Sequence, residues 1–259
     1  MRFKAVIEYD GTAYHGWQLQ KNLPTIQGKL EEALARILRE RVRIIGAGRT
    51  DAGVHAFGQT AHFTADWSHD AGDLHRGFNA LLPPDIAVKS LSVAALDFHA
   101  RHSAYSKVYI YRILNRPVRS PVLRHYAWHI PQDLNLSKMV EAARSLLGAH
   151  DFCTFGSPTD GTTSTVRKIL KAEWERDESH GMLSFTICGT GFLRYMVRSL
   201  VGTLARVGRE KITPHQFNDI LIACDRSRSG PTAPPNGLFL DSVQYGESGR
   251  RGLWGADDH

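Results

Sequence analysis

The sequence predicts an α+β fold of two related ferredoxin-like (split βαβ) halves, with antiparallel sheets flanked by helices. Stretches in which polar and apolar residues alternate, a pattern typical of strands, are separated by amphipathic stretches with helical spacing. The resulting order, strand–helix–strand–strand–helix–strand, is that of a split βαβ unit, and a similar order recurs later in the chain. We place the halves at residues 1–103 and 104–246, followed by a flexible, glycine-rich tail at 247–259.

The first half begins with an alternating stretch that predicts a strand over residues 3–9. Thr25 is well placed as the N-cap of a helix that carries apolar residues from 26 to 38 at helical spacing. Further strands are predicted at 42–45, 59–65 and 86–93, and a helix at 73–82 that ends before two prolines.

The second half begins with an alternating strand at 107–114. An amphipathic helix capped by Ser137 follows at 137–147, and two strands at 166–176 and 182–188 form a hairpin. The remaining elements are a long helix at 192–207, a shorter helix at 214–223 and a closing strand at 238–243.

Composition favours an anionic partner. The net charge of +6 and the sequence pI of about 9.3 suit nucleic acid or a phosphorylated substrate. The three cysteines are far apart and odd in number, so we expect reduced thiols rather than a disulfide framework. The chain has neither an N-terminal signal pattern nor an apolar run long enough to span a membrane, which predicts a soluble, cytoplasmic protein.

Several common catalytic motifs are absent from the sequence. It has no phosphate-binding Gly-x-x-x-x-Gly-Lys loop, no His-Glu-x-x-His pair and no Gly-x-Ser-x-Gly elbow. The run from Gly46 resembles the start of a dinucleotide fingerprint, but Asp51 stands at the third glycine position and would repel a pyrophosphate. The thirteen histidines show no ligand spacing, and His62 is expected to be a packed strand residue. We therefore expect no cofactor and no metal.

The loop from Gly46 to Gly58 is the strongest candidate for a functional segment. It contains four glycines, and Arg49 and Asp51 place opposite charges two residues apart between two predicted strands. Rigid scaffolds often present functional groups on such loops. The alternative is an ordinary turn, in which Asp51 bonds its own backbone and Arg49 is solvated. The residues alone leave both interpretations open.

The run GRTDAGVHAFGQTAHF closely resembles the catalytic-loop motif of the tRNA pseudouridine synthase A family. Three further runs resemble family motifs in the family's order: YDGTAYHGWQLQ, FHARHSAYSKVYIY and GFLRYMVRSLVG. The resemblance covers about residues 3–245. It implies a homodimeric isomerase that converts uridine to pseudouridine at positions 38–40 of the tRNA anticodon stem-loop.

The resemblance also implies roles for four residues. Asp51 becomes the catalytic aspartate, and Arg49 helps to displace the target base from the stack. Tyr109 packs on the uracil, and Arg198 is the partner of the aspartate. We expect the active site in a cleft between the two halves. The isomerisation needs no redox change and no external energy, which fits the absence of cofactor motifs.

Two other interpretations remain. The first is a non-catalytic basic RNA-binding module, although such a surface gains nothing from a carboxylate among phosphates. The second is a hydrolase of nucleoside glycosidic bonds, which typically needs a second carboxylate or a metal to activate water. No second acid accompanies Asp51 in its loop.

Overall fold

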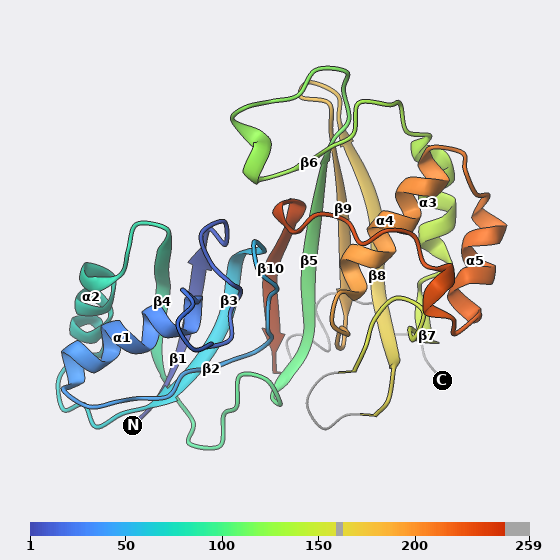
Figure 1. Cartoon of the computed structure of the whole chain (residues 1–259). Helices are drawn as coiled ribbons and strands as arrows, with labels where there is room; N and C mark the ends of the chain where they lie inside the picture. Colours follow the sequence, from blue (N-terminus) through green and yellow to red (C-terminus); the bar gives the residue numbers. More distant parts are fainter. Residues whose placement is uncertain (159–162, 247–259) are drawn as a thin grey trace. The chain divides into compact units, whose positions relative to one another are not determined.

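The computed structural model describes residues 1–158 and 163–246, which form two compact units of mixed α/β structure (Figure 1). Among these described residues, the first unit contains 1–107 and 239–246, and the second contains 108–158 and 163–238. The predicted flexible tail, residues 247–259, lies outside the described residues.

The first unit has a sheet in which β1 lies between β3 and β4, antiparallel to both. The short strand β2 pairs antiparallel with β3, so the strand order is that of a split βαβ unit. Strand β10 is added parallel to β3. The elements are β1 (Arg2–Tyr9), α1 (Ile26–Leu38), β2 (Ile45–Gly46), β3 (His55–Thr64), α2 (Ala71–Leu81), β4 (Ile86–Ala94) and β10 (Leu238–Tyr245).

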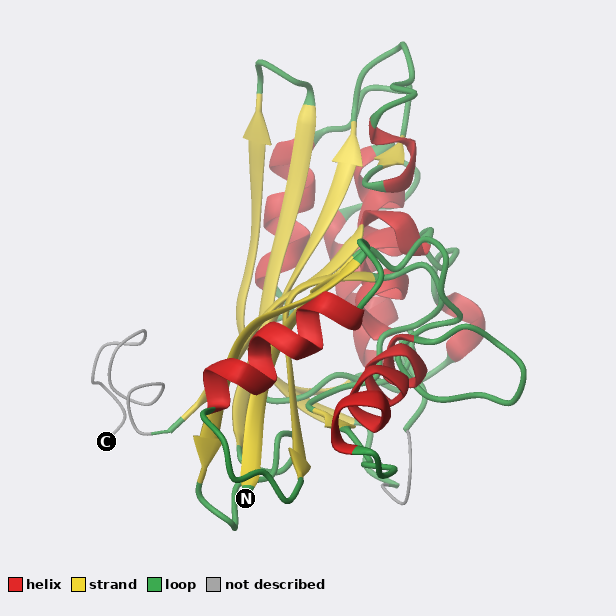
Figure 2. Cartoon of the chain, turned by 90° about the vertical axis from the view of Figure 1, so that its left-hand side faces the viewer, coloured by secondary structure: helices red, strands yellow, loops and turns green. Residues whose placement is uncertain are grey.

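Alternation in β1 creates the core of this unit. Its odd-numbered residues from 3 to 9 are buried and its even-numbered ones are half-buried, as expected for a strand with one face against helices. Helices α1 and α2 contribute buried side chains such as Leu30, Leu34 and Phe78, and they lie together beside the strands (Figures 1 and 2). The Thr25 side chain accepts a hydrogen bond from Gly28 N at 3.2 Å, which confirms the predicted N-cap.

The second unit has strands in the order β5-β9-β8-β7, with β6 paired parallel to β5. Strand β5 starts in the first unit and continues into the second. Helices α3, α4 and α5 pack on one another, and α3 also packs on β8 (Figure 1). The elements are β5 (Ala104–Leu114), β6 (Trp128–His129), α3 (Leu136–Arg144), β7 (Gly148–Asp151), β8 (Val166–Asp177), β9 (Met182–Gly189), α4 (Met196–Gly208), α5 (Pro214–Ile222) and three 3₁₀ turns, Leu123–His125, Arg226–Arg228 and Pro235–Gly237.

Several predicted elements differ from the structure. The sheets are mixed rather than antiparallel, because β10 and β6 join through long connections that permit parallel pairing. Only Ile45–Gly46 pairs as a strand where 42–45 was predicted, since Ile44 N bonds the side chain of Glu31 instead. Helix α3 is capped by Asn135 rather than Ser137. Helix α4 begins at Met196 rather than at residue 192, because Tyr195 has a left-handed backbone with φ of 64°.

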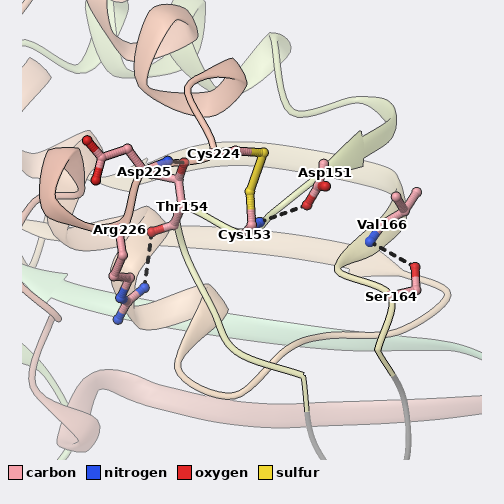
Figure 3. Close-up of a disulfide and its surroundings, with 8 residues drawn as sticks. All are labelled: Asp151, Cys153, Thr154, Ser164, Val166, Cys224, Asp225 and Arg226. Atoms are coloured by element: carbon pink, nitrogen blue, oxygen red, sulfur yellow. Dashed lines mark hydrogen bonds between the residues drawn. A yellow bond between two sulfur atoms is a disulfide. The ribbon is translucent and has the colours of Figure 1, made fainter.

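The cysteine prediction was wrong. Cys153 and Cys224 form a disulfide in the second unit, with Cα atoms 5.1 Å apart (Figure 3). Cys188 is a buried thiol outside this disulfide. The two cysteines are 71 residues apart in sequence, so local spacing could not reveal that the end of α5 meets the segment after β7.

No helix within residues 1–158 and 163–246 is long and apolar enough to cross a membrane.

Candidate active site

The loop that carries Arg49 and Asp51 joins β2 to β3 in the first unit. Ala47 N donates a hydrogen bond to Thr60 O at 2.7 Å, which starts the loop directly on β3. The side chains then alternate in exposure: Arg49 is exposed, Thr50 is buried and Asp51 is half-buried. The loop thus presents a cation to solvent and holds a carboxylate at the edge of the protein interior.

The backbone of the loop is bonded at both ends of the Asp51 turn. Thr50 O accepts from Trp17 N at 3.1 Å, and Asp51 O accepts from Val54 N at 3.2 Å. Gly53, whose φ is +76°, donates to Tyr14 O at 3.3 Å. These bonds account for a loop with little conformational freedom around the carboxylate.

The segment after β1 packs against the loop so closely that it requires glycine. A Cβ atom on Gly11 would lie 2.0 Å from Val54 O, and one on Gly16 would lie 2.6 Å from Thr50 O. Gly16 also has a φ of +87°, in the left-handed region that favours glycine. The glycines of the YDGTAYHGWQLQ run therefore support the Asp51 loop.

Trp17 has a structural position. Its side chain is 2% exposed, and a Cβ atom on Gly46 would lie 2.6 Å from the indole ring. The ring is also 6.2 Å from that of Tyr9. This burial gives Trp17 a structural role beneath the Asp51 loop rather than a surface position for stacking on RNA.

Tyr109 belongs to the second unit, where it lies on β5. Its side chain is 7% exposed, and its ring packs edge-on against Phe192 with centroids 5.0 Å apart. Strand geometry fixes its direction, because residues two apart on a strand share a face. Tyr109 is thus a well-packed aromatic residue on a rigid element.

Arg198 is half-buried in the first turn of α4, also in the second unit. Its Nε donates to Ala233 O at 2.8 Å, and its backbone O accepts from Ala233 N at 3.0 Å. The guanidinium carbon lies 5.4 Å from the ring centroid of Tyr195. Its charge also counteracts the effect of burial, which raises the pKa of Tyr111. Arg198 is therefore held in a defined orientation, with the end of its side chain next to aromatic rings.

The residues from the sequence prediction are thus distributed over both units. Arg49 and Asp51 share one loop of the first unit, whereas Tyr109 and Arg198 lie on β5 and α4 of the second. The prediction did not include Lys107 among the site residues, although its side chain lies beside the Asp51 loop. A Cβ atom on Gly48 would lie 3.6 Å from Lys107 Nζ. Lys107 stands two residues before Tyr109 within a quoted motif, so the signal was present in the sequence.

The predicted packed histidine is confirmed. His62 is 3% exposed, and its Nδ1 accepts a hydrogen bond from Ala100 N at 3.0 Å. Burial lowers its pKa to about 4, so the ring is neutral near pH 7. Among the described residues, the group spaced for a metal ion is Asp151, Cys153 and Cys224, and two of these three form the disulfide.

Comparison with protein families gives one match that covers most of the chain. The sequence model described as tRNA pseudouridine synthase matches residues 5–103 and 142–246. Both ranges include predicted site residues: Arg49 and Asp51 in the first and Arg198 in the second.

Curated relatives agree with this match. The chain is 46% identical to tRNA pseudouridine synthase A of Geobacter sulfurreducens over 242 residues, which cover 93% of this chain and 98% of the relative. It is 44% identical to the protein of the same name from Thermoanaerobacter sp. (strain X514) over 240 residues, with the same coverage. Against tRNA pseudouridine synthase A of Streptococcus mutans, the identity is 41% over 247 residues, 95% of this chain and 99% of the relative.

Solved structures show only a distant likeness. A Cbf5-Nop10-Gar1 complex aligns with 79% of this chain and 44% of the other chain at 12% identity and a TM-score of 0.38, too low to carry an argument. The chain belongs to the tRNA pseudouridine synthase A family and is a tRNA pseudouridine synthase, an isomerase.

Proposed function

We propose that the chain isomerises uridine to pseudouridine at positions 38–40 of the tRNA anticodon stem-loop, with Asp51 as the catalytic residue. The observation that carries this assignment is the half-buried carboxylate on a loop whose neighbouring carbonyls are bonded to Trp17 and Val54. A carboxylate held in this way can keep a fixed position relative to the reacting atom of a bound nucleoside, which favours the reaction.

The reaction conserves every atom of the nucleotide. The N1–C1′ bond breaks, the uracil rotates, a C5–C1′ bond forms, the proton at C5 leaves and N1 gains a proton. An ionised carboxylate can start this sequence by attacking C1′, adding to C6 or removing the proton at C2′. No electrons are exchanged with a partner and no external energy is consumed, and we propose that the reaction needs neither a cofactor nor a metal.

The target uridine must leave its stack, at a cost of a few kcal/mol. Arg49 is exposed two residues from Asp51 and is proposed to fill the space that the base leaves. Tyr109 is proposed to pack on the uracil, and its ring is already fixed against Phe192. Arg198 is proposed as the cationic partner of the aspartate, for which its half-buried guanidinium is suited.

We further propose that the enzyme works on tRNA in the cytoplasm as a homodimer. The halves 1–103 and 104–246 are proposed to be structural repeats. The order β1-α1-β2-β3-α2-β4 matches β5-α3-β8-β9-α4-β10 once β6, β7 and α5 are set aside. A repeat of this kind accounts for the ferredoxin-like pattern in both parts of the sequence.

The central test is Asp51→Asn, which keeps the size of the side chain and removes its charge. We expect pseudouridine formation in a single-turnover assay to be abolished, because the nucleophile or base of the reaction is lost. The melting temperature and the Kd for tRNA should stay near those of the wild type, since Asp51 is half-buried on a loop. All three quantities are measured on the same preparation.

Asp66→Asn is the matched control, because it removes the same charge from an exposed position of the same unit. It should isomerise uridine at the wild-type rate. A folded, tRNA-binding Asp51→Asn protein with near wild-type turnover would falsify the assignment of Asp51. A wild-type protein that binds tRNA but forms no pseudouridine would instead favour the non-catalytic RNA-binding module.

A further inference from the structure

Three polar side chains lie buried beneath the Asp51 loop and have no role in the chemistry proposed above. Tyr9 is 3% exposed, Thr50 is 7% exposed and Gln59 is fully buried. All three belong to the first unit. Buried polar groups are retained where their hydrogen bonds specify one conformation of their surroundings.

Sheet register explains how the three side chains meet. Gln59 of β3 lies opposite Ile7 of β1, and Tyr9 is two residues further along β1. Ile7 and Tyr9 share a face of β1. A register shift between them places Tyr9 opposite Ala56, on the side of the sheet where the Gln59 side chain influences its phenol. The Asp51 loop returns to β3 over this side, where Gln59 Nε2 donates to Gly48 O at 2.8 Å. Tyr9 Oη and Thr50 Oγ1 lie 2.8 Å apart.

The donors and acceptors fix the direction of each bond. Gly48 O can only accept, so the amide nitrogen of Gln59 faces the loop and its Oε1 faces away. Within the described residues, Gln59 Oε1 is buried and has no hydrogen-bond partner in the static geometry. A buried acceptor without a donor is unfavourable, and the neighbouring phenol of Tyr9 is a suitable donor.

Tyr9 can supply this proton at all ordinary pH values. Burial raises the pKa of Tyr9 despite the opposing influence of Thr50 and Gln59, so the phenol stays neutral. A small shift of the Tyr9 and Gln59 side chains would then complete a chain in which Thr50 donates to Tyr9, Tyr9 donates to Gln59 and Gln59 donates to Gly48. The chain is uncharged, so its geometry should not change with pH or salt.

This chain fastens the loop on both sides of Arg49. Gly48 is bonded through its carbonyl and Thr50 through its side chain, while Thr50 O is also bonded to Trp17 N. Asp51 follows Thr50 directly, so the direction of its carboxylate depends on these contacts.

We infer that Tyr9, Thr50 and Gln59 are positioning residues that set the orientation of the Asp51 carboxylate through this buried chain of hydrogen bonds. The inference rests on the proposed role of Asp51. It predicts an effect on the chemical step and little effect on tRNA binding.

The first test is Tyr9→Phe, which keeps the ring beside Trp17 and removes only the hydroxyl. Displacements of about 1 Å at a reacting group reduce rates by up to about 100-fold, so we expect a 10- to 100-fold lower single-turnover rate constant. The Kd for tRNA should change less than twofold. Tyr245→Phe is the control, because it removes a phenol hydroxyl of the same unit that donates to Ala100 O at 2.6 Å.

A second pair of variants separates positioning from packing. Thr50→Val keeps the shape of the side chain and should reproduce the loss seen in Tyr9→Phe, whereas Thr50→Ser keeps the hydroxyl and should restore most of the rate. Tyr9→Phe combined with Thr50→Val should be no slower than the worse single variant, because both remove one contact. Thr50→Val and Thr50→Ser test the positioning role even if a Gln59 variant, such as Gln59→Met, fails to fold.

The outcomes distinguish this inference from the assignment of Asp51. Near wild-type rates in both Tyr9→Phe and Thr50→Val, with Asp51→Asn inactive, would overturn the positioning role and leave Asp51 intact. An active Asp51→Asn protein would remove the assignment itself. Equal losses in rate and tRNA affinity would also overturn the inference, because they would indicate a general loss of structure.

Discussion

In the first unit, the Asp51 loop is fixed by backbone bonds and by neutral side chains that lie beneath it on paired strands. In the second unit, Arg198 is held by the segment 224–233, which crosses α4 after leaving α5. That segment is attached at its start by the Cys153–Cys224 disulfide and by Arg226, which donates to Thr154 O at 3.2 Å (Figure 3). The position of the proposed catalytic residue, Asp51, thus depends on strand register, and that of its proposed partner, Arg198, on a cross-linked connection.

The contacts of the 224–233 segment with α4 extend over about two turns of the helix. Arg226 reaches Ser199 Oγ at 3.3 Å, and Gly230 N donates to Thr203 Oγ1 at 2.9 Å. Ala233 forms the two bonds with Arg198. A change at either end of this segment should therefore reach Arg198, whereas the Asp51 loop should be insensitive to it.

Removing the disulfide should cause the largest loss in the free energy of unfolding. Cys153→Ser combined with Cys224→Ser should lower the free energy of unfolding by about 2–4 kcal/mol, since a 71-residue separation gives the unfolded chain much additional freedom. Turnover should also fall as the 224–233 segment loosens around Arg198. The measurements are urea unfolding and single-turnover rates, each with and without dithiothreitol.

The serine double variant supplies its own control, because reductant should destabilise the wild type and leave the variant unchanged. If dithiothreitol has no effect on the wild type, the disulfide does not close in solution. The second unit would then not differ from the first by having a covalent cross-link.

Local signals in the sequence were sufficient for most elements of both units. Thr25 caps α1 as predicted, and β8 and β9 pair antiparallel as the predicted hairpin. Such features depend on neighbours within a few residues, so a single sequence contains the information. The parallel pairing of β10 and the disulfide join residues far apart in the chain, and nothing in a local pattern identifies the partner.

In the candidate site, too, the features with a local sequence signal were predicted and those that depend on long-range pairing were not. The charge pair of Arg49 and Asp51 stood out in the sequence, although family resemblance was needed to choose catalysis over an ordinary turn. The supporting roles of Tyr9 and Gln59 were not predicted, because they depend on the register of β1 with β3. Gln59 was within the recognised motif, but only its bond to Gly48 reveals its contribution.

A smaller loss in the free energy of unfolding is expected from Gly202→Ala, which places a methyl group between α4 and the 224–233 segment. The Cβ atom of Gly202→Ala would lie 1.7 Å from Pro231 O, so the segment must move, at a cost of about 1–3 kcal/mol in unfolding free energy. Turnover should fall as well, because Ala233 follows Pro231 closely and holds Arg198. Chemical unfolding and single-turnover assays measure both changes.

Gly77→Ala is the matched control in the first unit. Gly77 lies within α2, and its added Cβ would meet only Ile37, at 3.6 Å. Alanine should stabilise this helix by about 0.5–1 kcal/mol and leave turnover unchanged. Equal activity losses in the two variants would show that α4 has no special dependence on the segment that covers it.

The smallest expected effect is a pH dependence of stability that originates in the first unit at His62. Burial lowers the pKa of His62 to about 4, whereas an imidazole in the unfolded chain titrates near 6.5. Between these two values the unfolded state binds a proton that the folded state does not, so stability increases with pH and is lost as pH falls. From pH 7 to 5.5 this one group should lower the free energy of unfolding by about 1 kcal/mol.

His62→Asn tests this origin, because its Oδ1 can still accept the hydrogen bond from Ala100 N while the side chain cannot be protonated. The variant should lose about 1 kcal/mol of the pH dependence in urea unfolding at pH 7 and 5.5. His69→Asn, at an exposed position of the same unit, should keep the wild-type dependence. If His62→Asn and the wild type lose stability equally on acidification, the pH response has another source. The pH dependence of the free energy of unfolding could then not be assigned to the first unit.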